Sequence, residues 1–215
     1  MTQKMLFILL VLAGCSSSKV KKEPAMEEVD NKKTIKLDYV VKDASVKQRP
    51  TWVEDGERWA KEYREDAGTH RYFSYTTESK ADKELACQIA KAQARADIAS
   101  QISTVIKKNI SIANDSVTLA QKEPKLQSYL EETFTEDIQA NLHGVSVEKT
   151  YWEKREYSQK KGAAKDFIGY SCSALLKIQR ESLQKAVDAA AQKIVEKTSP
   201  EGKAHMQQNL SQVTL

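Results

Sequence analysis

Residues 145–178 read VSVEKTYWEKREYSQKKGAAKDFIGYSCSALLKI, and this stretch decides the fold. Apolar and polar residues alternate from Val145 to about Tyr157, which is the period-two pattern of a strand with one buried face. A polar turn containing Gly162 follows, and the next run, Phe167–Ile178, is again rich in apolar residues. The stretch therefore predicts a β-hairpin of two antiparallel strands.

One more strand and three helices are predicted around this hairpin. Arg71–Thr77 is dense in aromatic and β-branched residues, as strands are. Apolar residues recur at helical spacing in three other segments, residues 79–108, 125–142 and 183–198. Because a sheet must cover its apolar face, these segments predict an α+β fold. We expect a two-layer sandwich in which the long helix and the C-terminal helix cover an antiparallel sheet of about three strands.

The long helix is expected to begin at an N-cap, Ser79, with Asp82 near the positive end of the helix dipole. Its middle is rich in alanine, which permits close packing. The residues expected on its packing face are Leu85, Ile89, Ala92, Ala96, Ala99 and Ile106, with Ala94, Ile98 and Val105 nearer to the other side.

The segment before the domain is polar. Residues 16–48 are rich in Lys, Glu, Asp and Ser, and we expect a flexible tether of about 30 Å there. Within it, apolar residues alternate over 35–41, which fits either an edge strand of the sheet or an extended segment lying on the domain. The folded part is expected to begin near residues 49–53, where Trp52 offers a large apolar anchor, with a short helix within 54–66.

The N-terminus carries an export signal. Lys4 precedes nine apolar residues, Met5–Ala13, a length typical of a signal-peptide core and too short to span about 30 Å of hydrocarbon. Leu12-Ala13-Gly14-Cys15 resembles the lipobox of bacterial lipoproteins, in which the cysteine thiol accepts diacylglycerol. The resemblance implies that residues 1–14 are removed and that Cys15 becomes the acylated, palmitate-bearing N-terminus.

Such an anchor implies that the protein is located in the cell envelope. Two or more acyl chains hold a protein on a bilayer almost permanently, at about 0.8 kcal/mol for each buried methylene. Ser16 stands where lipoproteins retained in the inner membrane usually carry aspartate, so the outer membrane is favoured, with the domain in the periplasm. The expected organisation is a signal peptide in 1–14, a lipidated tether in 15–48, an α+β domain in 49–198 and a C-terminal tail in 199–215.

Four features of the chain together resemble a known family. They are Pro50-x-Trp52-Val53, the aromatic strand Tyr72–Tyr75, the alanine-spaced helix around Ala90–Ile102 and the pair Tyr151-Trp152. They are similar to the LPP20-type lipoprotein family, related in fold to the N-terminal domain of a flagellar outer-membrane-associated protein, and they cover about residues 50–195. Ser74 stands where the family pattern has glycine. The resemblance implies a membrane-tethered α+β domain, in some cases near flagella, and supplies no catalytic residue.

No constellation of residues in the sequence points to a reaction. His70, His143 and His205 lack the spacing of metal ligands on a helix, so neither a metal nor a cofactor is expected. The pairs Glu131-Glu132 and Glu136-Asp137 fit a solvated helix surface. The sequence has no phosphate-cradling loop and no nucleophile elbow. A net charge of +4 is far below that of a nucleic-acid-binding stripe. We therefore expect neither an enzyme nor a nucleic-acid partner.

Two cysteines, Cys87 and Cys172, remain once Cys15 is acylated. An oxidising periplasm permits a disulfide between them. The predicted packing face of the long helix, however, points Cys87 away from the sheet, and buried free cysteines often act as small apolar groups. The pairing of Cys87 with Cys172 stays open at this point.

The leading hypothesis is a non-enzymatic envelope lipoprotein, held on the membrane by acyl chains, whose domain binds another envelope protein or the cell wall. A flagellum-associated role is a narrower form of it. The alternative is a carrier of small molecules or lipids, or a hydrolase with an unrecognised site, with Tyr72, Tyr75, Tyr151 and Trp152 lining a pocket. Strand packing explains these four aromatic residues more simply.

Overall fold

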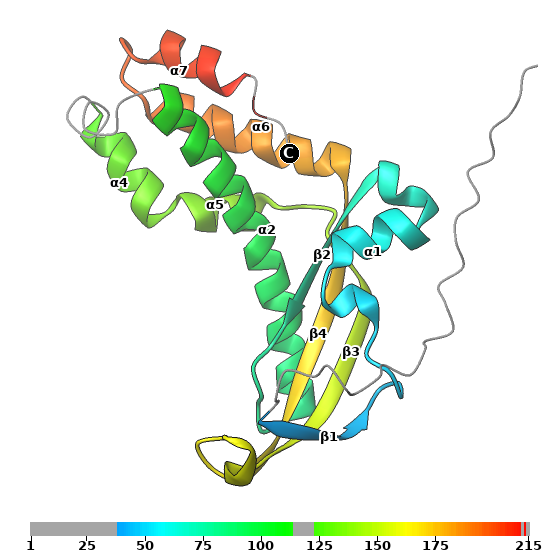
Figure 1. Cartoon of the computed structure of the whole chain (residues 1–215). Coiled ribbons are helices and arrows are strands. Elements are labelled where there is room, and N and C mark those ends of the chain that lie inside the picture. The colour runs from blue at the N-terminus through cyan, green and yellow to red at the C-terminus, as the bar shows by residue number, and fades with distance from the viewer. Residues whose placement is uncertain (1–37, 114–122, 212, 214–215) are drawn as a thin grey trace, which may run out of the picture.

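The computed structural model describes residues 38–113, 123–211 and 213. The strands within them are β1 (Tyr39–Ala44), β2 (His70–Thr76), β3 (Ser146–Tyr157) and β4 (Phe167–Gln179). The helices are α1 (Gly56–Tyr63), α2 (Lys83–Ala113), α4 (Pro124–Glu132), α5 (Phe134–Asn141), α6 (Arg180–Lys197) and α7 (Lys203–Leu210). The expected α+β class is confirmed (Figure 1).

The sheet is antiparallel, with strand order β1-β3-β4-β2. The hairpin predicted from the sequence, β3 and β4, forms its centre, and β2 pairs with β4 as one edge. The other edge is β1, which contains residues 39–41 of the alternating segment, and the sheet has four strands rather than three. β1 therefore lies inside the stretch 16–48, which was expected to be a flexible tether.

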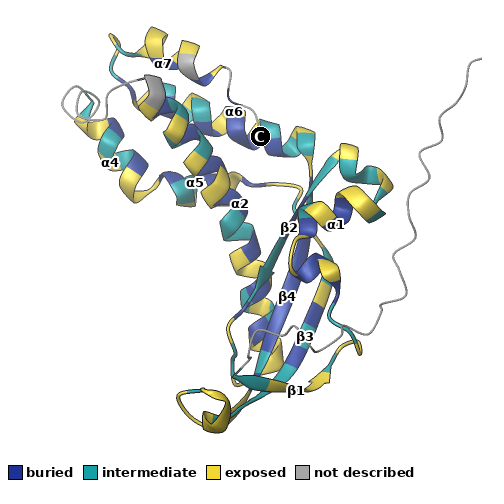
Figure 2. Ribbon diagram, viewed as in Figure 1, coloured by how far each residue is buried: buried dark blue, intermediate teal, exposed yellow. Residues whose placement is uncertain are grey.

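The larger core lies between α2 and one face of the sheet, and Figure 2 shows the buried residues of both in dark blue. From the sheet, Phe73, Cys172 and Leu176 contribute to it. The buried apolar residues of α2 are Ala86, Ala90, Ala94, Ile98, Ala99, Ile102, Ile106 and Ile110. The repeated alanines let the helix approach the strands closely.

The packing face predicted for this helix is partly wrong: Ala99 and Ile106 are buried as expected, but other positions are not. Leu85 is 47% exposed and Ala92 is exposed, whereas Ala94 and Ile98, expected nearer to the other side, are fully buried. Small apolar residues occupy several sides of the helix, so their spacing alone does not single out one face. The N-cap also lies later than Ser79. The carboxylate of Asp82 accepts from the backbone N–H of Leu85 at 2.8 Å and so caps α2.

A smaller core lies on the opposite face of the sheet. There a short 3-10 turn and α1 place Trp52 and Trp59 against Tyr72 and Leu175. Gly56 begins α1 where the chain touches the sheet, and a Cβ at this position would lie 2.5 Å from Leu175 Cδ1. The sheet is thus covered over part of both faces, where the sequence predicted one covered face.

The remaining helices pack around the C-terminal half of α2 and form an arm beside the sheet (Figure 1). The helix predicted over 125–142 is broken at Thr133 into α4 and α5. α6 follows β4 and packs mainly against α7 and α5, so most of it belongs to the arm rather than to the layer over the sheet. α7 lies in the stretch expected to be a tail, where Met206, Leu210 and Val213 are buried in the larger core.

Candidate functional site

A buried carboxylate, Glu153, is held by side chains on the sheet face that bears the smaller core. Tyr151 donates to its Oε1 at 2.9 Å, and Arg155 donates to its Oε2 from Nε at 2.8 Å. Arg49, from the segment after β1, reaches Oε1 at 3.4 Å. The Glu153 side chain is 4% exposed. Burial and the Glu153 charge raise the pKa of Tyr151, so the phenol stays protonated as a hydrogen-bond donor.

A second polar cluster surrounds Asp66. Tyr72 donates to its Oδ1 at 2.6 Å, and Lys177 Nζ lies 3.4 Å from its Oδ2 and 3.2 Å from Glu148. Arg64 completes the cluster at 2.9 Å from Glu148. Burial and the neighbouring carboxylate raise the pKa of Tyr72 to about 12. Although burial opposes it, the hydrogen bonds from Tyr72 and Lys177 lower the pKa of Asp66, so the carboxylate stays charged.

Both clusters pair cations with anions. In each, the carboxylates are held by hydrogen-bond donors and cations, so the geometry shows neither a free general base nor an activated nucleophile in it. No group of three or more His, Cys, Asp and Glu side chains in the described part of the chain is placed to hold a metal ion. The clusters therefore hold the fold together: the first joins β3 to the segment before α1, and the second joins the turn after α1 to the sheet.

The three histidines lie on separate parts of the fold. His70 begins β2, with Nδ1 3.6 Å from Asp66 Oδ2, while His143 precedes β3 and His205 is exposed on α7. They share no site in this structure.

The carboxylate pairs singled out in the sequence lie on α4 and α5. Glu131, Glu132 and Glu136 are exposed. Asp137 accepts from Tyr129 at 2.8 Å, and it lies 3.3 Å from Lys193 of α6. The hydrogen bond from Tyr129 is the main cause that lowers the pKa of Asp137. This carboxylate therefore links three helices of the arm.

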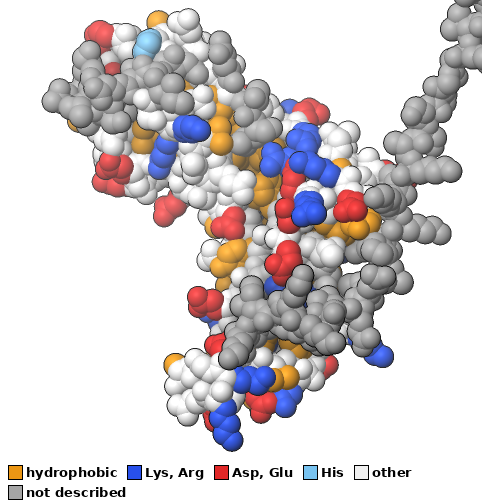
Figure 3. All heavy atoms as spheres, viewed as in Figure 1, with side chains coloured by type: hydrophobic (Ala, Val, Ile, Leu, Met, Phe, Trp, Pro, Cys, Tyr) orange, Lys and Arg blue, Asp and Glu red, His pale blue; other side chains and the backbone are white. Residues whose placement is uncertain are grey.

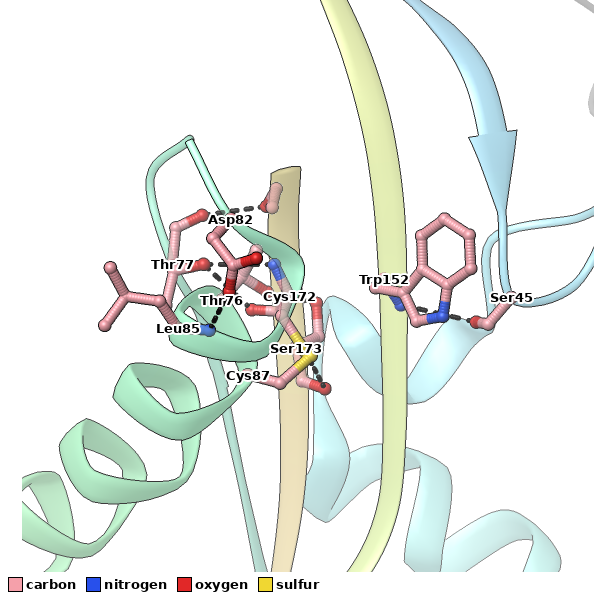
Figure 4. The surroundings of a disulfide bond; sticks show 10 residues. Ser45, Thr76, Thr77, Asp82, Leu85, Cys87, Trp152, Cys172 and Ser173 are labelled. Carbon is pink, nitrogen blue, oxygen red and sulfur yellow. Dashed lines mark hydrogen bonds between the residues drawn. A yellow bond between two sulfur atoms is a disulfide. The ribbon is translucent and has the colours of Figure 1, made fainter. Parts of the chain in front are cut away.

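The structure contains a disulfide between Cys87 of α2 and Cys172 of β4, whose Cα atoms are 5.0 Å apart (Figure 4). Cys172 is fully buried, and its backbone N–H and C=O exchange hydrogen bonds with Thr77. The predicted packing face pointed Cys87 away from the sheet, but Cys87 packs against the larger core and can therefore reach Cys172. The bond ties the start of α2 to the centre of the sheet.

The aromatic residues considered as pocket lining belong to the cores. Tyr72 and Tyr151 are buried in the smaller core, while Tyr75 and Trp152 pack against the larger one. None of the four lines the groove described next.

An open groove of about 470 Å³ lies between α6 and α7. Its apolar lining is Ala191, Val195 and Leu210, and its polar lining is Asp188, Gln192, Glu196, Lys203, Gln207 and Ser211. The sequence analysis missed this groove because the final helix was not predicted. The only available signal was the four-residue spacing of Met206 and Leu210, which is weak in so short a segment.

Exposed apolar residues gather at the end of the sheet where the chain enters the domain. They are Val40, Val41, Phe167 and Ile168, at 38–54% exposure. The register places Tyr39, Tyr157 and Phe167 side by side across β1, β3 and β4. Their rings form a ladder, with centroids 5.2 Å apart in the first pair and 4.3 Å in the second.

No protein-family model matches the chain, and neither a curated protein nor a solved structure matches it. Cys15, the expected site of acylation, lies outside the described residues. None of the helices that the structure describes is long and apolar enough to cross a membrane.

Proposed function

We propose that this protein is a lipoprotein of the bacterial cell envelope, anchored in the outer membrane, whose folded domain is a non-enzymatic interaction module. The anchor rests on the lipobox-like Leu12-Ala13-Gly14-Cys15 after an apolar run. The role of the domain rests on its charged clusters, which are paired within the fold, and on its surface features.

The observation that carries this proposal is that the chain enters at one end of the domain and the groove lies at the other. Near the entrance, Ser158 donates its backbone N–H to the C=O of Asp38 at 3.1 Å, beside the β3–β4 turn. The α6–α7 groove lies on the arm at the far end (Figure 1). Between them runs α2, whose 31 residues correspond to roughly 46 Å of helix. An anchor at the first end holds the groove away from the membrane.

We assign partner binding to this groove. Its apolar residues Ala191, Val195 and Leu210 lie among charged and amide side chains, a composition suited to an amphipathic segment of another envelope protein. A helix laid in a groove in this manner buries its apolar face while its polar face stays in water.

A carrier of small molecules is the second candidate function. The observation that favours it is the volume of the same groove, which falls within the roughly 300–1,000 Å³ usual for ligand sites. A protein partner fits better, because most of the lining residues are polar and lie on the outer surfaces of α6 and α7.

A photo-crosslinking amino acid at Gln207, which lines the groove, is expected to give a discrete adduct with an envelope protein in intact cells. The same amino acid at Gln88 or Gln139, both exposed on other helices, serves as the matched control. Val195→Asp, which places a charge in the apolar lining, should reduce the Gln207 adduct at least tenfold. Equal adducts at all three positions, or none at Gln207, would reject the groove as the binding site.

A further inference from the structure

The turn between β3 and β4 is an ordered projection. Gln159 donates its backbone N–H to Asp166 Oδ1 at 2.6 Å and its side-chain amide to the C=O of Ala164 at 3.2 Å. Gly162 takes a φ of 103°, a left-handed conformation that glycine adopts without strain. These bonds give the backbone of the hairpin tip a defined shape relative to the sheet.

The tip combines positive charge with apolar surface. It carries Lys160, Lys161 and Lys165, all exposed, and beside them Phe167 and Ile168 are 38% and 54% exposed. Figure 3 shows basic and hydrophobic side chains next to one another at this lower end of the molecule. Within the described part of the chain, neither Lys160 nor Lys161 forms an ion pair, and the one carboxylate of the tip, Asp166, accepts from Gln159. The tip therefore carries three lysines against one carboxylate, next to the exposed side chains of Phe167 and Ile168.

The tip also lies where the chain enters the domain. The backbone hydrogen bond between Ser158 and Asp38 joins the start of the turn to the first described residue. Residues 16–37 separate Asp38 from Cys15, and a chain of this length spans at most about 80 Å and about 25 Å as a coil. Acyl chains on Cys15 would keep this end of the sheet, more than any other part of the domain, close to the bilayer.

We propose that the β3–β4 tip is a second membrane contact, which docks on anionic phospholipid. The inference rests on the proposed acyl anchor and adds to it an orientation of the domain. The three lysines approach the charged headgroups while Phe167 and Ile168 enter the interface between headgroups and acyl chains. Near an anionic surface each lysine strengthens binding about fivefold, as one kcal/mol per basic residue implies. The anchor supplies the high local concentration that so small a patch needs.

A partner protein that adds a strand to the edge of the sheet explains the exposed residues at this end less well. The outer edge of β1 carries Lys42 at a register shift between Val41 and Asp43, and both features hinder edge-to-edge pairing. A lysine-rich tip with exposed apolar residues requires no backbone pairing to bind a lipid surface.

The contact is testable by tryptophan fluorescence in the acylated full chain, purified from envelopes and reconstituted into vesicles containing brominated phospholipid. Phe167→Trp places the probe at the tip, and His205→Trp, exposed on α7 at the far end, is the matched control. The chain's own tryptophans also fluoresce, so the signal of the parent protein is subtracted. Trp52 and Trp59 are buried and Trp152 is partly covered. In vesicles with about one third phosphatidylglycerol, we expect quenching at position 167 several-fold above that at position 205.

The charge on the tip is tested in the same samples. In a triple variant of the tip, quenching at position 167 should fall to the control level. The three changes are Lys160→Glu, Lys161→Glu and Lys165→Glu. The same changes at Lys91, Lys108 and Lys125, exposed on α2 and α4, should leave it unchanged. Salt at 1 M, where the Debye length is about 3 Å, should screen the lysines and lower the quenching at position 167 as the tip variant does.

Quenching that is absent at position 167, or equal in neutral and anionic vesicles, would overturn the proposal. Flotation with the vesicles and the mass of the Cys15 peptide are recorded alongside. A chain that floats without tip quenching refutes the docking contact alone, whereas a chain without acyl groups refutes the proposed anchor.

Discussion

Replacing both Cys87 and Cys172 with alanine is expected to lower the free energy of unfolding by about 4–5 kcal/mol. The two cysteines are 85 residues apart, and closing a loop of this length removes that much conformational entropy from the unfolded chain. Because the bond joins the start of α2 to the centre of β4, its loss also frees the helix that contributes more buried residues to the larger core than any other element. For a domain of this size, the midpoint of thermal unfolding should fall by about 10–20 °C.

The measurement is urea unfolding of the detergent-solubilised full chain, with the parent protein and the double alanine variant side by side. The parent protein treated with reductant is the control, since it keeps both side chains and lacks only the bond. It should unfold at nearly the same urea concentration as the variant. A variant within 1 kcal/mol of the oxidised parent, or two free thiols in the denatured parent without reductant, would show that the bond does not stabilise the fold.

Glu153→Ala is expected to cost about 3–5 kcal/mol of stability, because it leaves the buried guanidinium of Arg155 without its carboxylate. Tyr151 loses its acceptor at the same time, and Arg49 loses its contact across the sheet edge. Glu153→Gln keeps the shape and one acceptor, so its cost should be smaller. These effects are read from chemical denaturation at pH 7.

The matched control is a double replacement of Glu153 and Arg155 by methionine and leucine, which removes both charges together. Apolar replacements of a buried ion pair are often neutral, so this variant should be more stable than Glu153→Ala. If Glu153→Ala alone costs less than about 1 kcal/mol, water reaches Arg155 and the cluster does not stabilise the fold.

The sequence predicts the strands and long helices because their local patterns are strong. Alternation over residues 145–157 and the apolar run over 167–178 predict the hairpin, and the aromatic run near Tyr72 predicts β2. The alanine-rich helix is equally recognisable, but its buried face is not. Alanine occurs on several sides of the helix, so the faces differ little in hydrophobicity. That single error also led to the argument against the disulfide. The break at Thr133 has neither glycine nor proline to mark it.

The polar clusters are harder to predict because they unite distant segments. Tyr151, Glu153 and Arg155 lie two residues apart, so the strand period alone puts them on one face. Their partner Arg49 lies more than a hundred residues away in the sequence, and only the pairing of β1 with β3 brings it near. The groove depends in the same way on α7, a short helix stabilised by tertiary packing rather than by its own sequence pattern.

The proposed anchor and the orientation of the domain both depend on acylation of Cys15, and mass spectrometry of the N-terminal peptide from protein extracted from native envelopes tests it directly. The predicted result is a peptide that begins at Cys15 and carries acyl chains on the thiol and the amino group. A peptide that still contains residues 1–14, with the Cys15 thiol unmodified, would contradict the anchor, and the proposed orientation of the domain at the membrane would be lost with it.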